Sequence, residues 1–572
     1  MTARRVLFAL LALLPLAELP GTGFDVLRLP LALALGAALL ALGPVARPGL
    51  AGAALLALLG ARALSLGVSA DPSAGFRALL VGATAFAAYA AAREAKAEPG
   101  LLAAAAGVLL GVAAWQRAHG LPGASLLGNS NYAGAYAAML LPALAAGPRN
   151  PLALFGAAAA GVLLALSESR GGLFGAVVGT LVAAALLWRG GRRREAGAFA
   201  SILLLAASLA VAARPAKFFS PERLETVVVR FEIWKGGLRL GASRPLLGAG
   251  AGGFAAAFPP YRSAEEARIT QRNESGRYPE VDNAHSSWVQ SFAEGGFLGA
   301  LAWLALVAAA ARRIGASGVE GAGWAGVVAA FFAAGLFNTL TDHVSPMVLF
   351  GAALGFLEGP GGRPAPKAAG RTAAAALGLG CLWTASLVAS DRAYTAVAET
   401  PAERERVLRS SGEWRFRFRL GEELARQGRP AEAVDAFRSA LEARPFHAVS
   451  LNNLAVALLK AKAPGEEVDR VLARAAEVAP HYHLTHFNLG LRHLEKGQPA
   501  AARAQFERAA WLNETHPASR YEIGATYVAE GDIPAALPHL RRAKELGVDV
   551  LTAIRREYPA RAADPRLEEL RR

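Results

Sequence analysis

The sequence predicts an all-α protein in two parts: a polytopic bundle of about 12–13 transmembrane helices and a C-terminal α-solenoid. Hydrophobic residues make up 54% of the 572 residues and charged residues only 18%, against about 25% charged in a typical globular chain. Before about Thr400 the charge lies in short islands between long apolar runs, and beyond it charge is spread throughout. We therefore expect one part solvated by lipid and one solvated by water.

The apolar runs approach the length of membrane-spanning helices, which need about 20 residues. They cover residues 6–20, 27–43, 48–66, 76–92, 100–116, 130–146, 151–167, 171–188, 198–213, 297–311, 323–340, 345–357 and 372–389. The first run follows Arg4 and Arg5, as a cleaved signal peptide would. It lacks a small-x-small cleavage site, so we expect a retained span.

Positive charge alternates between the predicted loops. One set of loops holds Arg4, Arg5, Arg47, Arg93, Lys96, Arg149, Arg189, Arg192, Arg193, Arg194, Arg312, Arg313, Arg363, Lys367 and Arg371. The short loops of the other set hold only Arg28, Arg77, Arg117 and Arg170. By the positive-inside rule the first set is cytoplasmic. The N-terminus is then inside, and the polar segment 214–296 and everything after Ser390 are outside.

Beyond about Phe416 the sequence repeats itself at intervals of 34–35 residues. Three series are in register: Gly421, Ala455, Gly490 and Gly524; Ala440, Ala475, Ala509 and Ala543; and Phe437, Val471, Phe506 and Leu540. The pattern resembles the tetratricopeptide repeat, in which small residues let paired helices pack and a bulky apolar residue fills between them. We expect about four such repeats in a domain at 416–560, after a linker at 391–415. Such arrays bind protein partners in many families, and the alternative is a spacer or stabilising cap.

The net charge of +15 does not indicate nucleic-acid binding. Most arginines of the apolar part lie in short loops, where they orient helices, and no recognised nucleic-acid motif accompanies them. We therefore expect no nucleic-acid partner. The single cysteine, Cys381, lies in an apolar run, which excludes a disulfide or a thiolate metal cluster within one chain.

Two weaker patterns point to cofactors or metals. Gly248, Gly250 and Gly253 satisfy the dinucleotide pattern G-x-G-x-x-G, but no strand–helix–strand context surrounds them, so we reject it. His481, His483 and His486 cluster at a turn between repeats, where the alternatives are a metal site and a solvated surface. With no carboxylate nearby we favour the surface, and we expect no cofactor and no metal.

Ionisable residues at membrane depth are costly, so their positions are informative. Arg170, in Ser167-Glu168-Ser169-Arg170-Gly171-Gly172, lies in an outer loop too short to be a domain. It is either a snorkelling arginine at a helix end or a functional group, and its place on the face poor in positive charge favours function. The long outer segment contains Arg230-Phe-Glu-Ile-Trp-Lys235 and ends with Asn283-Ala-His285-Ser-Ser287.

His285-Ser286, nine residues, Gly296, two residues and Gly299 together resemble the histidine motif of bacterial O-antigen ligases. That motif is shared with protein O-oligosaccharyltransferases and overlaps the O-antigen polymerase superfamily. Four more blocks are similar to this superfamily: Gly128-Asn-Ser-Asn-Tyr132, Ser169-Arg170-Gly171, Arg230 with Trp234, and Pro245-Leu-Leu-Gly248 before an aromatic cluster ending at Tyr261. The resemblance covers about 1–390, and members with appended tetratricopeptide repeats are familiar.

The resemblance implies transfer of a glycan from a polyprenyl (undecaprenyl) diphosphate to an acceptor hydroxyl, on lipid A-core or another molecule, at the periplasmic face of the bacterial inner membrane. Guanidinium groups match phosphate oxygens, so Arg170 and Arg230 are the candidates that bind the diphosphate. His285, with an ordinary pKa of about 6.5, suits proton transfer from the acceptor. Without the motif, a hydrogen-bonding loop histidine would be the preferred interpretation.

Five further residues are candidates for substrate binding: Lys235, Asn129, Asn131, Tyr132 and Glu294. Each has an alternative or a supporting role. Lys235 either adds charge to the donor pocket or faces water, and an Asn at a helix start is often only an N-cap. Glu294 is placed to orient the histidine loop. Asp342 and His343, in another outer loop, are held in reserve.

Several functions remain open at this stage. Enzymatic alternatives are an O-antigen or polysaccharide polymerase and a protein O-oligosaccharyltransferase. A non-enzymatic envelope-assembly scaffold is an alternative of another class, although the retained His285, Arg170 and Arg230 argue against decay of a catalytic site. A transporter is less favoured, because apart from Arg62 the spans contain almost no charge to line a pathway.

Overall fold

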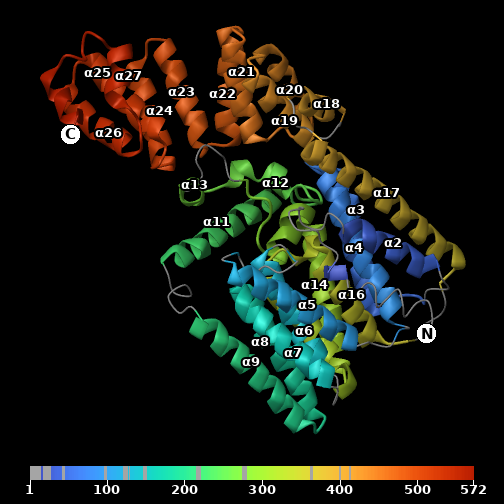
Figure 1. The fold of residues 1–572 in the computed structure, drawn as a ribbon. Helices are drawn as coiled ribbons and strands as arrows, with labels where there is room; N and C mark the ends of the chain where they lie inside the picture. Colours follow the sequence, from blue (N-terminus) through green and yellow to red (C-terminus); the bar gives the residue numbers. More distant parts are fainter. Residues whose placement is uncertain are drawn as a thin grey trace. The chain divides into compact units, whose positions relative to one another are not determined.

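The structure is a computed structural model of the chain (Figure 1). It describes all residues except 1–13, 17–27, 42–45, 94, 96–98, 120, 122–126, 128, 146–150, 214–220, 273–279, 361–364, 398–400, 411–413 and 572. The predicted span 6–20 therefore lies almost wholly outside the described residues, as do Gly128 and the start of the polar segment at 214. Every regular element among the described residues is a helix, which confirms the all-α fold class.

The chain forms two compact units. The first comprises Met1–Leu224, Gly237–Phe254 and Asn283–Arg392, and the second comprises Glu225–Gly236, Ala255–Asp282 and Ala393–Arg572. Two pieces of the outer segment thus belong to the same unit as the repeats. Each unit is described by itself below.

Helices of the first unit coincide with the predicted apolar runs. They are α2 (Arg28–Ala41), α3 (Leu50–Leu66), α4 (Pro72–Ala92), α5 (Pro99–Ala118), α6 (Ser130–Ala145), α7 (Pro151–Ser167), α8 (Arg170–Arg189), α9 (Arg193–Ala213), α14 (Ser287–Ala316), α15 (Ala322–Ala334), α16 (Val344–Glu358) and α17 (Lys367–Val397). The largest differences from the prediction are in α14, α15 and α17, and α17 extends to Val397, beyond its predicted run. α14 begins at Ser287, before its apolar run, and α15 ends at Ala334, because a turn and the short helix η5 (Leu340–Asp342) occupy the rest of that run.

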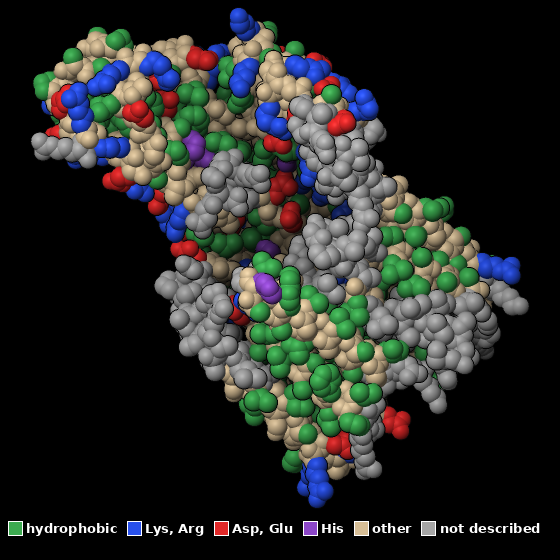
Figure 2. Space-filling model, in the orientation of Figure 1, with side chains coloured by type: hydrophobic (Ala, Val, Ile, Leu, Met, Phe, Trp, Pro, Cys, Tyr) green, Lys and Arg blue, Asp and Glu red, His purple; other side chains and the backbone are tan. Residues whose placement is uncertain are grey.

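Four helices among the described residues are long and apolar enough to cross a membrane: α4, residues 100–118 of α5, α8 and α14. Most of the others are apolar but shorter, so the number of spans stays a prediction. Large apolar side chains point outward from several helices, and Leu181, Leu301 and Leu382 are 61%, 64% and 69% exposed. Figure 2 shows apolar side chains gathered over the helices of this unit and charged ones over the repeats. Such an apolar surface is expected of helices that face lipid.

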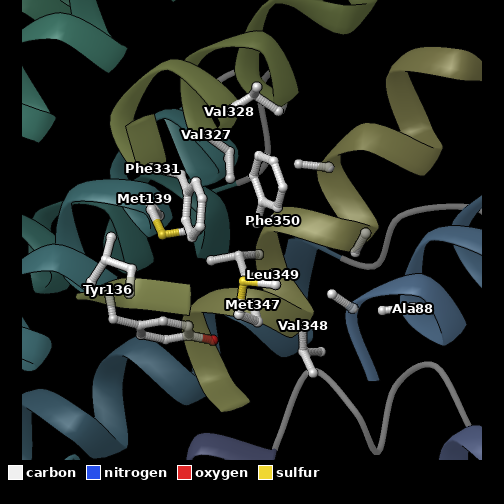
Figure 3. Packing of buried hydrophobic residues seen from close by; sticks show 14 of the residues in the cluster. Ala88, Tyr136, Met139, Val327, Val328, Phe331, Met347, Val348, Leu349 and Phe350 are labelled. Carbon is white, nitrogen blue, oxygen red and sulfur yellow. The ribbon is translucent and has the colours of Figure 1, made fainter. Parts of the chain in front are cut away.

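The core of the first unit lies between α6, α15 and α16 (Figure 3). Phe331 of α15 stacks on Phe350 of α16 with ring centroids 4.0 Å apart, and Met139 of α6 lies among the same buried side chains. Behind α15, α8 presents glycines: a Cβ at Gly179 would lie 2.6 Å from the carbonyl oxygen of Gly326. Small residues therefore bring these helices into backbone contact, as in membrane bundles.

Several predicted cytoplasmic charges gather at one end of this bundle. Glu358, the last residue of α16, accepts a hydrogen bond from Arg313 Nη2 (2.5 Å) and one from the backbone N–H of Ala51 at the start of α3 (3.3 Å). Arg93, after α4, donates to the carbonyl oxygen of Arg47 (2.7 Å). Loops predicted to share a face are thus grouped, whereas which face is cytoplasmic stays a prediction.

Four helix pairs form the repeats of the second unit. They are α19 (Trp414–Arg426) with α20 (Pro430–Ala443), α21 (Ala448–Lys460) with α22 (Gly465–Val478), α23 (His483–Glu495) with α24 (Pro499–Leu512), and α25 (Pro517–Glu530) with α26 (Ile533–Glu545). α18 (Pro401–Ser410) precedes them, and α27 (Val550–Glu557) and η6 (Pro565–Arg571) follow.

The predicted repeat series pack as expected. A Cβ at Gly490 would lie 2.4 Å from the Phe506 ring, and one at Gly524 would lie 2.5 Å from the Leu540 side chain. The small residue of each first helix thus receives the bulky residue of the second. The solenoid of about four repeats is confirmed.

The outer segment also folds into helices. α11 (Pro221–Ser243) contributes residues to both units, and α12 (Phe254–Ala257), η3 (Pro259–Tyr261) and α13 (Ala264–Gln271) follow it. Arg262 and Glu266 form a buried two-bond ion pair (2.6 and 2.7 Å) that fixes the start of α13.

Candidate active site

His285 lies in the first unit, in a tight loop directly before α14. Its φ angle is +49°, a conformation that is uncommon for a non-glycine residue. Its backbone N–H donates to Asn283 Oδ1 (2.9 Å), and the next residue, Ser286, caps α14 by accepting a hydrogen bond from the N–H of Val289 (3.4 Å). The side chain of His285 is half-buried. The loop therefore holds the histidine in a constrained backbone conformation.

A second loop, residues 338–343, is bonded to the histidine loop. Asn283 Oδ1 also accepts from Thr339 Oγ1 (2.9 Å). Ser287, fully buried, donates its N–H and its hydroxyl to the carbonyl oxygen of Asn338 (3.1 Å each) and accepts from the N–H of Leu340 (2.9 Å). These four hydrogen bonds fix the start of α14 to the loop that precedes α16.

Arg170 is the first residue of α8. Ser169 caps this helix through a hydrogen bond from the N–H of Gly172 (3.0 Å). The preceding residue, Glu168, has φ +54° and pairs with Arg117 (2.9 Å), and Arg117 also donates to the carbonyl oxygen of Leu166. The short loop between α7 and α8 is therefore fixed at both sides, and Arg170, half-buried, stands at a helix N-terminus.

The Arg170 loop and the loop 338–343 are in contact. A Cβ at Gly171 would lie 2.6 Å from Asn338 Nδ2. The hydroxyl of Ser169 donates to the carbonyl oxygen of Asn131, at the start of α6 (3.5 Å), and the ring of Tyr132 packs against that of His343 with centroids 3.7 Å apart. Four loops far apart in the sequence thus meet at one end of the first unit.

Electrostatics at this end favour an anion. The N-termini of α6, α8 and α14 all lie in these joined loops, and each carries the positive end of a helix dipole with backbone N–H groups that the helix leaves unpaired. Arg170 adds a guanidinium, whose planar set of donors matches phosphate oxygens. A phosphate group is the anion that such helix ends and arginines bind most readily.

Backbone strain singles out the same loops. Among the described residues, three non-glycine residues have positive φ: Glu168, His285 and Lys462. The first two lie in the two loops that carry Arg170 and His285, and the third lies in the repeats. Strained non-glycine conformations of this kind are retained where surrounding structure over-determines them, often at functional sites.

The two glycines of the histidine motif have a structural explanation. At Gly296 (φ +56°, ψ −150°) α14 is broken, and a Cβ there would lie 2.5 Å from the carbonyl oxygen of Pro245. The N–H of Phe297 donates to that oxygen (2.7 Å), so the Pro245–Gly248 block is bonded to the break. At Gly299 a Cβ would lie 2.4 Å from the carbonyl oxygen of Ser291. The motif spacing therefore encodes a broken helix that begins just after His285.

Glu294 is connected to the histidine loop through one side chain. Gln290 accepts a hydrogen bond from the N–H of Ala284 (2.7 Å) and donates to Glu294 Oε1 (2.7 Å), which also accepts from the N–H of Phe254 (3.3 Å). Glu294 is buried, 5% exposed. Its geometry fits the predicted orienting role and places its carboxylate away from the loop surface.

A buried arginine of α3 is bonded to the loop 338–343. Arg62 of α3 pairs with Asp342 (3.2 Å) and donates to the carbonyl oxygens of Thr341 (3.3 Å) and Ala78 (3.1 Å). Arg62 and Glu294 line one small enclosed space with Ser65 and Ser291. The polar groups around the histidine loop thus continue into the bundle.

The other predicted residues lie as follows. Arg230 and Lys235 are on α11, in the part that belongs to the second unit. Lys235 is exposed and pairs with Glu232 (2.7 Å). The side chain of Asn129 accepts a hydrogen bond from the backbone N–H of Asn131 (2.8 Å). Asn129 therefore caps the N-terminus of α6, which is the alternative to substrate binding given above.

The structure therefore brings together Arg170, His285, Asn131 and Tyr132 in the first unit. The connecting loop 338–343 was not singled out from the sequence beyond Asp342 and His343, because its partners lie up to 280 residues away. Among the described residues, no group of three or more His, Cys, Asp or Glu side chains is placed to hold a metal ion.

The structure of the second unit explains the histidine trio. His483 is fully buried, with Nδ1 2.7 Å from Gln271 Oε1, and His486 Nδ1 is 2.8 Å from Gln505 Oε1. His481 Nδ1 accepts from Arg508 (3.2 Å). Their ring nitrogens are thus used in contacts within this unit.

No curated protein matches the chain significantly. Among solved structures, MamA from Desulfovibrio magneticus RS-1 (residues 41 to its end) is 23% identical over 27% of this chain and 90% of that one, with a TM-score of 0.25. Another MamA crystal structure is 17% identical over 30% of this chain and 91% of that one, also with a TM-score of 0.25.

Family models match two separate regions. Residues 155–304 match the O-antigen ligase family, a range that contains Arg170, Arg230 and His285. Residues 418–482 and 487–547 match the tetratricopeptide repeat. The resemblance predicted from the sequence is thereby confirmed: residues 155–304 are similar to the O-antigen ligase family, and two C-terminal regions are similar to tetratricopeptide repeats.

Proposed function

We propose that the protein transfers a glycan from a polyprenyl diphosphate carrier to an acceptor hydroxyl at the periplasmic face of the inner membrane, as an O-antigen ligase does. The observation that carries the proposal is the joining of the Arg170 loop and the His285 loop by hydrogen bonds and contacts through residues 338–343. The family match over 155–304 supports this class of reaction.

In the proposed reaction, the acceptor oxygen attacks the anomeric carbon of the lipid-linked sugar. A new C–O bond forms, and the bond between that carbon and the phosphate oxygen breaks. Its electron pair leaves with the polyprenyl diphosphate, while His285 accepts the proton of the acceptor hydroxyl. Cleavage of the glycosyl–phosphate bond, with a diphosphate as the leaving group, supplies the driving force, so no nucleotide takes part.

Arg170 and the α8 N-terminus stabilise the charge that develops on the leaving diphosphate. Arg230 is proposed as the second guanidinium on the resemblance and the family match. Tyr132 and Asn131, at the start of α6, are proposed to contact the donor or the sugar. Gln290 and Glu294 act through the backbone of Ala284 and are positioning residues.

The direct test is glycan transfer by variants in membranes, with protein levels checked by immunoblot. His285→Ala and Arg170→Ala are each expected to reduce transfer by about 100-fold or more, the size expected when a general base or a charge-stabilising group is removed. Asp435→Ala, in the repeats at a position whose side chain is 79% exposed, is the control and should keep most of the activity. Normal transfer by both site variants would exclude the proposed mechanism.

The pattern of lipid-linked products separates the enzymatic alternatives. Deleting a ligase leaves long unattached chains on the carrier lipid, whereas deleting a polymerase leaves single repeat units. Loss of sugar from a protein acceptor would instead identify a protein O-oligosaccharyltransferase.

A further inference from the structure

The part of the outer segment that precedes the histidine loop is bonded to the repeats within the second unit. Its partners belong to three turns, residues 444–447, 480–483 and 513–516, which we call the inter-repeat turns. These turns lead into the first helices of successive repeats, α21, α23 and α25. The contacts therefore recur with the period of the repeats.

The central contact is made by Gln271, the last residue of α13. Its amide donates to the carbonyl oxygens of His481 (2.7 Å) and Ala267 (2.9 Å), and its oxygen accepts the backbone N–H of His483 (3.1 Å) and lies 2.7 Å from His483 Nδ1. Both side chains are completely buried. All hydrogen-bonding positions of this amide are thus used, and three of the four bonds go to the repeats.

The protonation of His483 fits this arrangement. Its Nε2 accepts from Asn513 Nδ2 (3.4 Å), so the neutral ring carries its proton on Nδ1 and donates it to Gln271. Burial lowers the pKa of His483 to about 3, with a smaller contribution from the neighbouring His516. The ring is therefore neutral throughout the physiological range, as the contact with Gln271 requires.

Residues close to Gln271 contact the next inter-repeat turn, residues 513–516. Arg268 of α13 pairs with Glu514 (3.0 Å), and its guanidinium lies over the Trp511 ring, 5.8 Å from the centroid. The hydroxyl of Thr515 donates to the carbonyl oxygen of Arg272 (2.9 Å). Side chain and backbone of the segment are thus both held by the turn 513–516 and the helix before it.

Glu280 is bonded to the first inter-repeat turn, residues 444–447. This carboxylate lies 2.9 Å from His447 Nε2 and 3.5 Å from Arg444 Nη1, and Arg444 is itself stacked over Trp414, 4.2 Å from the centroid. Burial alone would raise the pKa of Glu280, but the hydrogen bond from His447 and the charge of Arg444 outweigh it and lower the pKa to about 2. His447 accepts the N–H of Ser450 on its Nδ1 (3.3 Å), which leaves Nε2 to donate to Glu280.

We propose that the inter-repeat turns are a docking surface for two stretches of the same chain, residues 262–272 and 280–282, and that this docking is required for transfer. The inference rests on the proposed function. Glu280 stands five residues before His285, and five residues of chain span at most about 17 Å. Holding Glu280 and Gln271 therefore restricts the histidine loop. In this account the repeats act on the transferase segment of the same chain, as a positioning domain.

The test is a charge exchange in the purified full-length protein. Arg268→Glu and Glu514→Arg each place like charges together, and the double variant restores an opposite pair. Both side chains are partly exposed (27% and 46%), so folding is expected to survive. Arg438→Glu is the matched control, because Arg438 pairs with Glu467 within the repeats at similar exposures (49% and 29%). Gln271→Ala is a stronger variant, which leaves buried groups of the turn unpaired.

Two measurements are made on each variant: hydrogen–deuterium exchange of residues 264–272, and glycan transfer. The single variants should raise exchange about 2–5-fold and lower transfer by a similar factor, as expected for loss of a partly exposed ion pair. Gln271→Ala should change both by about tenfold or more. The double variant should recover both, and the control should change neither.

Three results would overturn the proposal: unchanged exchange in Gln271→Ala and both single variants, faster exchange with undiminished transfer, or no recovery in the double variant. His285→Ala is measured in parallel. If it transfers normally the proposed function fails, whereas exchange in the charge series still decides the docking surface.

Discussion

At the scale of single residues, the structure explains why His285 needs its neighbours. The N–H groups of Ala284 and His285 are accepted by Gln290 and Asn283, and Asn283 is in turn bonded to Thr339. Such a network stabilises the histidine in its positive-φ conformation, because it fixes the loop on both sides. Side chains that never touch substrate should therefore affect transfer.

Gln290→Leu tests this network. The substitution keeps the size of the side chain but leaves the N–H of Ala284 and a carboxylate oxygen of Glu294 without this partner. An unpaired buried polar group costs about 1–3 kcal/mol, so we expect transfer to fall about tenfold with little loss of protein from the membrane. Ser386→Ala, on α17, is the control, because its exposed hydroxyl donates to the carbonyl oxygen of Trp383 in the same helix (2.7 Å). Undiminished transfer by Gln290→Leu would show that the histidine loop does not depend on this bond.

At the scale of elements, the break in α14 is the feature on which the site depends. Its first part carries the N-terminus that follows His285, and its second part is a long apolar helix. The conformation of Gly296 is essentially restricted to glycine, and the Pro245–Gly248 block is bonded to it. Two of the resemblance blocks thus meet at one backbone position.

Gly296→Ala and Gly295→Ala form a matched pair at this break. A Cβ at Gly296 would meet three backbone atoms within 2.8 Å, whereas a Cβ at Gly295 would meet nothing within 4 Å. We expect Gly296→Ala to reduce folded protein and transfer severely, since strain of about 1–3 kcal/mol adds to the clash, while Gly295→Ala keeps both. Equal behaviour of the two variants in a detergent melting assay would contradict the geometry of the break.

The repeats should lose stability in mild acid. Burial lowers the pKa of His481 and His516 to about 4 and that of His483 to about 3, and neighbouring charges contribute less to the lowering at His481 and His483. Their unfolded pKa is about 6.5. Between these values the unfolded chain binds protons that the folded repeats do not, so stability rises with pH through this window and falls as pH drops below 6.5.

For the fully buried His483, this loss is about 1 kcal/mol for each pH unit below 6.5. Tryptic digestion of the repeats, followed at pH 7.5 and at pH 5.5 with a protease-activity standard, measures it. Faster cleavage at pH 5.5 is expected, and His483→Asn should reduce the difference. A rate independent of pH, or one that falls in acid, would contradict the assigned neutral histidines.

At the scale of the whole molecule, orientation is the prediction on which the proposed site depends. The chain has one cysteine, Cys381, so a Cys381→Ser background allows single-cysteine labelling. In intact spheroplasts, an impermeant thiol reagent should label Asp435→Cys in the repeats, where the side chain is 79% exposed. Arg194→Cys, in the predicted cytoplasmic loop, should react only after permeabilisation. The reverse pattern would place the site in the cytosol.

Much of this molecule could be predicted from its sequence. The apolar runs predicted the helices of the first unit. The repeats were predicted by two series of residues at intervals of 34–35, one containing Gly490 and the other Phe506. Both kinds of pattern are local in the sequence. The Arg170 and His285 loops were found through charge placement and family motifs. The loop 338–343 carries no motif and sits within an apolar region, so only its Asp342 and His343 drew attention.

Contacts between distant polar residues could not be predicted. Gln271 and His483 are 212 residues apart, and nothing in the composition of either segment specifies the other. The histidine trio was therefore assigned to a solvated surface, whereas His483 is fully buried against Gln271. A hydrogen bond between a buried amide and a neutral imidazole produces no periodic pattern in a sequence.

The measurement that tests the central claim most directly is transfer by the purified protein. Polyprenyl diphosphate-linked glycan and an acceptor such as lipid A-core are mixed with the detergent-solubilised chain, and glycosylated acceptor and released polyprenyl diphosphate are quantified together. The account predicts that both products form in equal amounts with the natural sequence, and that His285→Ala and Arg170→Ala form neither. Equal product formation by these variants, or none by the natural protein under conditions where it is folded, would contradict it.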